Sequence, residues 1–249
     1  MSKLTPEDVV LRYSKRGMNV LKKYLKDGYC RTAAEKLLHA ERGTVLLTTG
    51  FYVAGYAETD GPLGTVAVAE ALNHLGFHSV VVTDKYCKGF FELKQLDVEY
   101  VDIAADEQVY EDILDKYNPV YMISIERCGE NAEHEYANMR GVSITSETAA
   151  IDHLFELAPE KHIPTIGVGD GGNEIGMGNV KDIISEKLEL NPCVVPVDDL
   201  IIATTSNWGA YALTAWLQKL SGEEVLFTFA RSEEHTSELQ SQTCISYAV

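Results

Sequence analysis

The sequence lacks long hydrophobic runs. None of its 249 residues belongs to an apolar stretch as long as the roughly eighteen residues that a membrane-spanning helix needs. The N-terminus, MSKLTPEDVVLRYSKRG, also lacks the charged-then-apolar pattern of a secretory signal and the arginine content of an obvious transit peptide. We therefore expect no membrane partner and a soluble cytoplasmic protein, or a mitochondrial matrix protein if the source is a eukaryote.

Basic residues are scarce. The chain has 21 lysines and arginines against 38 aspartates and glutamates, which gives a formal net charge of −17. Nucleic-acid phosphates require a basic face, so this balance argues against a nucleic-acid partner. It also gives no help in attracting an anionic metabolite, so any site for one must be locally positive.

Paired cysteines are absent as well. Before residue 231 the cysteines are Cys30, Cys87, Cys128 and Cys193, and their spacing contains neither a CxxC pair nor a zinc pattern. We expect free thiols in a reducing compartment.

The last nineteen residues, RSEEHTSELQSQTCISYAV, resemble one reading frame of a sequencing-library adapter. They are polar, without a clear period, and follow abruptly on the apolar run EVLFTFA. We expect two parts: one α/β domain over residues 1–230 and a non-native tail over residues 231–249. The natural chain is then expected to continue past Ala230, so the fold would be truncated. Nothing in the sequence decides the oligomeric state.

Apolar runs alternate with amphipathic stretches along the rest of the chain. The apolar, β-branched runs predict strands at 44–51, 78–84, 98–103, 120–126, 163–169, 198–206 and 224–230. The amphipathic stretches predict helices at 6–40 with a break near Gly28, and at 64–76, 88–96, 106–118, 145–158 and 207–222. Strands separated by helices predict a mostly parallel sheet with helices on both faces, a Rossmann-like three-layer sandwich.

Five unusual polar loops each follow a predicted strand. In a parallel sheet the carboxyl ends of the strands meet at one edge, where ligands bind. We expect these loops to form one site. Its candidate substrate-binding residues are Gly50, Thr59, Asp60, Asp84, Arg127, Arg140, Gly169, Gly171, Gly172, Asn173, Ser206 and Asn207.

The glycine-rich loop GVGDGGNEIGMGNV, residues 167–180, contains a superficial GxGxxG pattern. A dinucleotide fingerprint is disfavoured because Asp170 would lie beside a pyrophosphate and repel it. The GK[ST] ending of a phosphate-binding P-loop is absent. We favour a pocket in which backbone N–H groups of residues 169–173 point at an anionic oxygen, with Asp170, Asn173 and Glu174 on the same wall. The alternative is a turn-rich loop whose carboxylates cap a helix.

Two helix starts and two arginines can each be interpreted as structural or as substrate-binding. Thr59 or Asp60 either caps the helix that begins near residue 63 or leaves the helix N-terminus beside a substrate carboxylate. Ser206 or Asn207 is expected to cap the last helix on the same rim. Arg127, directly after a strand, and Arg140 are candidates to hold a substrate carboxylate through paired hydrogen bonds. The alternative is a surface ion pair of little value.

Several motifs occur together in one order: TTGF, ETDGPLG, VTD, ERCG, YANMRG, GVGDGGNEIGMG and SNWGAYALTAWL. In this combination the chain resembles the D-glutamate cyclase C-terminal-like family, long known as a domain of unknown function (DUF4392), over about residues 6 to 230. The resemblance implies a carbon–oxygen lyase that converts D-glutamate to 5-oxo-D-proline and water. In vertebrates the domain is the C-terminal part of a longer mitochondrial enzyme. One departure is Cys128, where the family pattern has proline.

The chemistry of lactam formation, rather than the resemblance, assigns roles to residues. A carboxylate must take a proton from the ammonium, and a carboxylic acid must protonate the departing oxygen. Asp170 and Glu174 are the leading pair and Glu126 is the third candidate. Backbone N–H groups of 169–173 would stabilise the oxyanion. Arg127 would hold the α-carboxylate of the small amino-acid substrate.

Two other interpretations stay open. Lactam formation requires no cofactor, but Asp60, Asp170 and Glu174 could instead hold Mg²⁺ or Mn²⁺, which favour oxygen ligands. The chain could also be a phosphate- or nucleotide-handling Rossmann-like enzyme, or a non-catalytic module that binds an amino acid.

Overall fold

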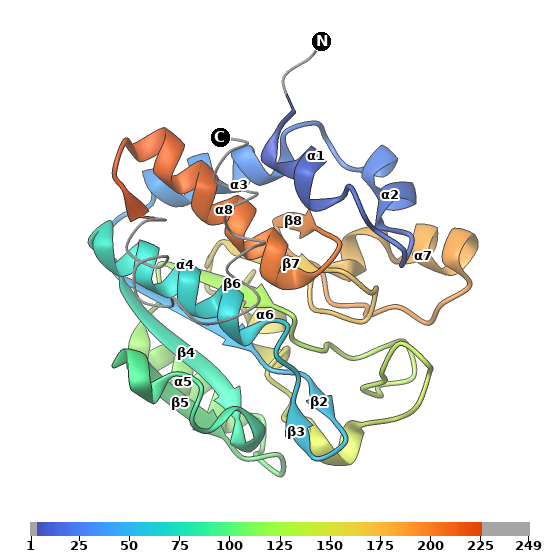
Figure 1. Cartoon of the computed structure of the whole chain (residues 1–249). Helices are drawn as coiled ribbons and strands as arrows, with labels where there is room; N and C mark the ends of the chain where they lie inside the picture. The colour runs from blue at the N-terminus through green and yellow to red at the C-terminus, as the bar shows by residue number, and fades with distance from the viewer. Residues whose placement is uncertain (1–3, 226–249) are drawn as a thin grey trace.

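Six of the predicted apolar runs form one parallel sheet in the computed structural model, which describes residues 4–225 (Figure 1). The strands are β1 (Thr44–Thr49), β4 (His78–Asp84), β5 (Asp97–Val101), β6 (Tyr121–Ile125), β7 (Thr165–Gly169) and β8 (Asp199–Ile202). Their order is β5-β4-β1-β6-β7-β8, and every neighbouring pair is parallel. The predicted fold class, a Rossmann-like α/β sandwich, is confirmed.

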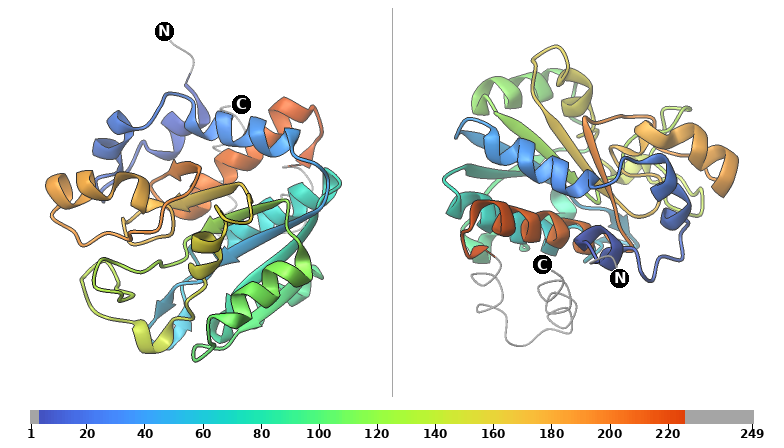
Figure 2. Two further views of the ribbon diagram at one scale, coloured as in Figure 1. Left: turned by 180° about the vertical axis from the view of Figure 1, so that it is seen from behind. Right: turned by 90° about the horizontal axis from the view of Figure 1, so that it is seen from above.

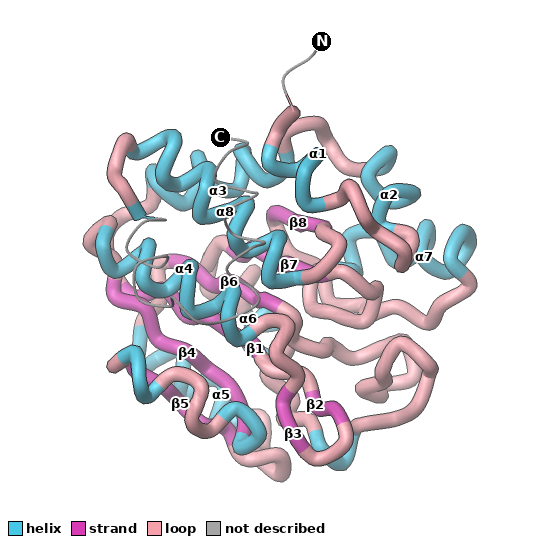
Figure 3. Tube along the Cα trace, in the orientation of Figure 1, coloured by secondary structure: helices cyan, strands magenta, loops and turns pink. Residues whose placement is uncertain are grey.

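Helices cover both faces of the sheet, which makes three layers (Figure 2). On one face α8 (Ser206–Ser221) packs against both α3 (Tyr29–His39) and α4 (Pro62–His74). On the other face lie α5 (Gln108–Tyr117) and α6 (His153–Leu157). At the β8 side, α1 (Pro6–Val10) contacts α8, and α2 (Met18–Leu21) contacts α7 (Lys181–Leu188). Figure 3 shows how much of the remaining chain is loop at the end where β2 (Tyr52–Val53) and β3 (Tyr56–Ala57) form a small hairpin.

Short 3₁₀ turns complete the described elements. They span Lys22–Tyr24, Lys85–Cys87, Glu92–Lys94, Thr145–Glu147 and Met177–Val180. Between residues 4 and 225, no helix combines the length and the apolar character that crossing a bilayer would take.

The opening helical region, predicted over 6–40, is divided into three helices. Gly17 and Gly28 precede α2 and α3 with φ of +86° and +72°, a conformation that favours glycine. A Cβ on Gly17 would lie 2.3 Å from Cδ2 of Leu188, so this turn is fixed against α7.

Two predicted helices are wrong in length. Residues 88–96 form only a 3₁₀ turn, because the Glu92 carboxylate accepts hydrogen bonds from the backbone N–H groups of Gly89 and Phe91, and Gln95 has φ +55°. Residues 145–158 form a 3₁₀ turn and then α6, because Asp152 is held by groups of the preceding loop. Most of the strand predicted at 224–230 and the tail predicted at 231–249 lie outside the described residues.

The strand order reverses between β1 and β6, in the middle of the sheet. From β1 the chain moves outward through β4 to β5, and it then returns to β6 beside β1 before moving outward again to β8. The loops after β1 and β6 therefore diverge at their carboxyl ends, which is the topological switch point where open α/β sheets bind ligands.

Candidate active site

Three carboxylates meet at this switch point. Asp60 comes from the loop after β1, Glu126 directly follows β6, and Asp170 directly follows β7. One oxygen of each lies within 4.8 Å of the others. A Cβ on Gly61, which has φ +98°, would lie 2.7 Å from the Cβ of Glu126, so glycine is needed for this approach. We call Asp60, Glu126 and Asp170 the acid cluster.

Glu126 is buried, with 4% of its surface exposed. Its backbone has φ +51°, which is unusual outside glycine and is typical of strained functional positions. Burial, and then the charges of Asp170, Glu174 and Asp60, raise the pKa of Glu126 well above its usual value. The Ser206 hydroxyl donates a hydrogen bond to its carboxylate, which opposes the shift. Glu126 thus favours the protonated form.

Asp170 is fully buried in the glycine-rich loop. Its Oδ1 accepts a hydrogen bond of 2.7 Å from Nη1 of Arg16, while Oδ2 has no partner among the described residues. Burial and the charges of Glu174 and Asp60 raise the pKa of Asp170 to about 9, and Arg16 opposes this rise. One arginine does not neutralise the cluster.

Asp60 and Asn207 cap each other's helices. Asp60 accepts hydrogen bonds from the backbone N–H groups of Ser206 and Asn207 at the start of α8. The Asn207 side-chain oxygen accepts from the backbone N–H groups of Gly61 and Gly64 at the start of α4. The sequence predicted that each residue caps the helix at its own position in the chain, and this is wrong because each caps the other helix. Both helix N-termini are therefore occupied by protein side chains.

Glu174 fills the backbone pocket predicted for the substrate. Its two carboxylate oxygens accept hydrogen bonds of 2.7 Å from the N–H groups of Gly171 and Gly172. The loop does bind an anion, as its glycines indicated, but the anion is its own glutamate. The N–H groups of Gly171 and Gly172 were expected to form an oxyanion hole, but they bind Glu174 instead. Glu174 was expected to be one of the leading catalytic pair, but its carboxylate holds the loop.

The expected role of Arg127 needs a similar correction. Its guanidinium is 1% exposed and donates to Asp84 Oδ2 at 2.6 Å, to the carbonyl of Gly50 at 3.1 Å and to the carbonyl of Ala149 at 2.5 Å. Gly50 is required there, since its φ is +102° and a Cβ would lie 2.5 Å from the Cys87 sulfur. Arg127, Asp84 and Gly50 therefore form a buried structural unit. Nε of Arg127 has no hydrogen-bond partner among the described residues, but Arg127 is not among the residues that line the site cavity described below.

A cavity of about 470 Å³ adjoins the acid cluster. It is lined by Arg16, Phe51, Tyr52, Val53, Ala54, Glu58, Glu126, Asn138, Met139, Arg140, Val142, Ser143, Ile144 and Asn173. We call it the site cavity. Glu126, Arg140 and Asn173 all line this cavity, and the Asn173 side-chain amide donates to the carbonyl of Ala137.

Sequence analysis missed Arg16 and Glu58. Burial and then the charge of Asp60 raise the pKa of Glu58, whereas Arg16 lowers it. Glu58 stands two residues before Asp60 in a polar strand-exit loop, which was an available signal. No local pattern marks Arg16, which lies 154 residues from its partner Asp170. The other predicted binding residues differ in exposure to solvent. Thr59 is exposed, whereas Gly169 and Ser206 are buried.

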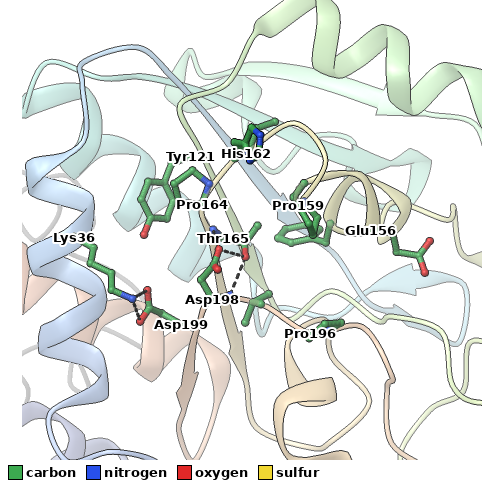
Figure 4. Close-up of a pocket in the computed structure, with 14 residues that line it drawn as sticks. Lys36, Tyr121, Glu156, Pro159, His162, Pro164, Thr165, Pro196, Asp198 and Asp199 are labelled. Atoms are coloured by element: carbon green, nitrogen blue, oxygen red, sulfur yellow. Dashed lines mark hydrogen bonds and ion pairs between the residues drawn. The ribbon is translucent and has the colours of Figure 1, made fainter.

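A larger cavity, about 690 Å³, lies at the opposite edge, beside the first residues of β6, β7 and β8 (Figure 4). Three of its charged groups already have partners: Lys36 donates to both oxygens of Asp199, and Asp198 accepts hydrogen bonds from the N–H and hydroxyl groups of Thr165. Size alone therefore does not identify the site. The unneutralised carboxylates are at the carboxyl edge.

The acid cluster has the donor set of a divalent metal site. Three carboxylate oxygens close together, one of them without a hydrogen-bond partner, suit Mg²⁺ or Mn²⁺. The predicted set is corrected in one member, because Glu126 takes the place of Glu174. All four cysteines among the described residues are buried free thiols, as predicted, and Cys128 packs with Phe51, Tyr136 and Ile144.

Comparisons with known proteins agree with the motifs. The family model described as D-glutamate cyclase-like, C-terminal, matches residues 7–246, a range that reaches into the predicted tail. The human protein named D-glutamate cyclase, mitochondrial, is 34% identical, and the match covers 74% of this chain. The chain spans 34% of the length of that relative.

Solved structures match only weakly. The enzyme WbmG of Bordetella bronchiseptica in complex with NAD has a TM-score of 0.35 and 11% identity, covering 73% of this chain and 51% of its own. An actinorhodin polyketide ketoreductase with NADPH has a TM-score of 0.35 and 14% identity, covering 83% and 90%. Likenesses at this level carry no argument about the site. The family match covers nearly the whole sequence, and the chain belongs to the D-glutamate cyclase-like, C-terminal family.

Proposed function

We propose that this chain is a lyase that closes D-glutamate into 5-oxo-D-proline with release of water. The family and the printed name of the human relative support the substrate. The observation that carries the chemistry is the acid cluster: three carboxylates within 4.8 Å of one another, beside a cavity large enough for a small amino acid.

The reaction forms one bond and breaks another. The α-nitrogen attacks the γ-carboxyl carbon, a C–N bond forms, and a C–O bond of that carboxyl breaks. The ammonium loses two protons in total, and both end on the departing oxygen, which leaves as water. No oxidant or reductant takes part. The enzyme must accept a proton from nitrogen, supply one to oxygen, and hold the chain folded for ring closure.

The acid cluster can do both proton transfers. Three carboxylates so close together do not all ionise at neutral pH, so the cluster contains proton donors and acceptors together. Glu126, which forms no ion pair within the described chain, is the proposed acid for the departing oxygen. Asp170 is the proposed base, and it acts from its ionised form, whose share increases as pH rises toward its pKa of about 9.

The pKa of Asp170 suits that role. A base whose pKa lies near that of the amine exchanges its proton at small cost in free energy. The pKa of Asp170 is about 9, within the range of an amino-acid ammonium. Burial raises the pKa of Asp60, and three hydrogen bonds from backbone N–H groups oppose this rise and hold its carboxylate beside the pair.

The direct test incubates the full chain separately with D-glutamate and L-glutamate and follows both by chiral chromatography. We expect D-glutamate to disappear and 5-oxo-D-proline to form in equal amount. The variant Asp170→Asn, which lacks the proposed base, should lose this activity. Its matched control is Asp115→Asn, since Asp115 lies on α5 with its side chain 73% exposed, and this control should keep the full rate.

Two other results would each oppose the proposal. D-glutamate that raises the melting temperature but is never consumed would indicate an amino-acid-binding module. Stabilisation by nucleotides alone would favour a phosphate-handling enzyme, although Glu174 already occupies the loop amides that a phosphate would need.

A further inference from the structure

The acid cluster creates a problem for any acidic substrate. D-glutamate carries two carboxylates, and the site cavity ends at Glu126 with Glu58 beside it. A carboxylate approaching such groups is repelled unless a cation accompanies it. Arg127, which directly follows Glu126 in the sequence, already forms a buried ion pair with Asp84.

Arg16 is placed to supply that cation. It lies in the segment between α1 and α2, and it lines the site cavity. Burial raises the pKa of Glu58, Asp60 and Asp170, and the charge of Arg16 opposes each rise, so its field reaches both the cavity wall and the cluster. Its side chain is 43% exposed, while that of Asp170 is fully buried.

The guanidinium of Arg16 has donors to spare. An arginine side chain carries five N–H donors, and a carboxylate is bound best by two parallel ones. Within residues 4–225, Asp170 is the one hydrogen-bond partner of this guanidinium, through Nη1. Its other donors have no partner among residues 4–225, and Arg16 is one of the residues that line the site cavity.

We infer that Arg16 binds the α-carboxylate of the substrate and thereby selects α-amino acids. This inference rests on the proposed function. In an α-amino acid the carboxylate and the ammonium are attached to the same carbon. A substrate held by Arg16 therefore brings its ammonium next to Asp170, the residue to which Arg16 is already bonded. The same contact offsets the repulsion from the cluster and delivers the nitrogen to its base.

The test removes the arginine and the α-carboxylate separately. 4-Aminobutyrate is glutamate without its α-carboxylate, and it serves as the second ligand. Binding of each ligand is measured by isothermal titration calorimetry to the wild-type chain and to Arg16→Ala. We expect the variant to bind D-glutamate at least about tenfold more weakly, which is the loss of one charge-assisted bidentate contact, and to bind 4-aminobutyrate as wild type does.

Two further variants sharpen the result. Arg16→Lys keeps the charge but not the paired donors, so it should recover part of the affinity for D-glutamate. Arg12→Ala is the matched control, since Arg12 is an exposed arginine of the same segment with no hydrogen bond or ion pair from its side chain to the described residues. It should bind both ligands as wild type does.

Distinct outcomes overturn distinct claims. Unchanged D-glutamate affinity in Arg16→Ala, or an equal loss for both ligands, would overturn the assignment of Arg16. A loss specific to D-glutamate in Arg140→Ala instead of Arg16→Ala would move the contact to Arg140, which lines the same cavity. A wild-type chain that binds no D-glutamate at all would overturn the proposed function, and this inference with it.

Discussion

Two arginine–aspartate pairs lie at the carboxyl edge of the sheet, and they differ in almost everything except distance. Arg127 and Asp84 are joined at 2.6 Å, and Arg16 and Asp170 at 2.7 Å. In the first pair both side chains are buried, at 1% and 5% exposure. In the second the aspartate is fully buried, but 43% of the arginine side chain is exposed.

Charge balance separates the two pairs. Arg127 faces one carboxylate, and its other contacts are backbone carbonyls, so the unit is neutral and closed. Arg16 faces several carboxylates, and Asp170 keeps one oxygen without a described partner. A neutral, closed pair can stabilise the fold but has nothing to offer a ligand. An unneutralised pair beside a cavity can exchange protons with one.

The largest expected effect is on turnover. Asp170→Asn should lower the rate of 5-oxo-D-proline formation by about 10²–10⁴-fold, the usual contribution of a positioned acid or base. Its melting temperature should be unchanged or higher, because the substitution removes a buried carboxyl from an unneutralised cluster. Product formation and thermal unfolding are both measured at neutral pH. An active Asp170→Asn would remove this residue from the mechanism.

The closed pair should show the opposite behaviour. Asp84→Asn leaves the Arg127 guanidinium buried without its counter-charge, and we expect a loss of about 3–5 kcal/mol in the free energy of unfolding. Urea denaturation of the variant measures it, with Asp97→Asn, an aspartate whose side chain is 68% exposed, as the control. A stability loss no larger than that of the control would mean that the two pairs are not different in kind.

A smaller effect is expected at the glutamate that holds the glycine-rich loop. In Glu174→Gln one of the two N–H groups, of Gly171 or Gly172, faces an amide NH₂ instead of an oxygen. A buried N–H without an acceptor costs about 1–3 kcal/mol in stability. Urea denaturation checks this, and Glu186→Gln on α7, with its side chain 64% exposed, should be neutral. Equal stabilities would show that the loop does not depend on Glu174.

The raised pKa of Asp170 also predicts a dependence of stability on pH, which is measured as a slope. Asp170 has a pKa of about 9 when folded and 3.8 as an ordinary carboxyl, so the native state keeps a proton that the unfolded chain releases. Its contribution to stability is full below pH 4 and is lost as pH rises toward 9. The slope is up to about 1.4 kcal/mol per pH unit for one proton. Denaturation across pH 5–8 should show a shallower decline for Asp170→Asn than for wild type. Parallel curves would contradict the raised pKa.

Much of the fold could be predicted from the sequence, because buried parallel strands are continuous apolar runs and the polar segments after them share one edge. That rule brought Asp60, Glu126 and Asp170 into one site. The helix predicted at 145–158 failed because its residues are tied to the preceding loop: Asp152 accepts from the Tyr136 hydroxyl and the Glu130 N–H. Periodicity contains no information about such long-range hydrogen bonds.

The division of labour within the site could not be predicted in the same way. Residue type alone does not say that Glu174 turns back to its own loop or that Arg127 has a buried partner. Arg16 comes from a segment with no motif and reaches Asp170 across 154 residues. Packing decides which arginine forms a buried, neutral ion pair and which keeps donors for a ligand. Only the folded chain therefore distinguishes the two arginines.

The central claim, that the Arg16–Asp170 pair is not an ordinary ion pair, can be tested by infrared difference spectroscopy. The spectrum of Asp170→Asn is subtracted from that of the wild-type chain at pH 7. We predict that the variant loses the C=O band of a protonated carboxylic acid, and that in wild type this band titrates near pH 9. Loss of an ionised carboxylate band at pH 7 instead would show that Arg16 neutralises Asp170 as fully as Arg127 neutralises Asp84, and it would contradict the account.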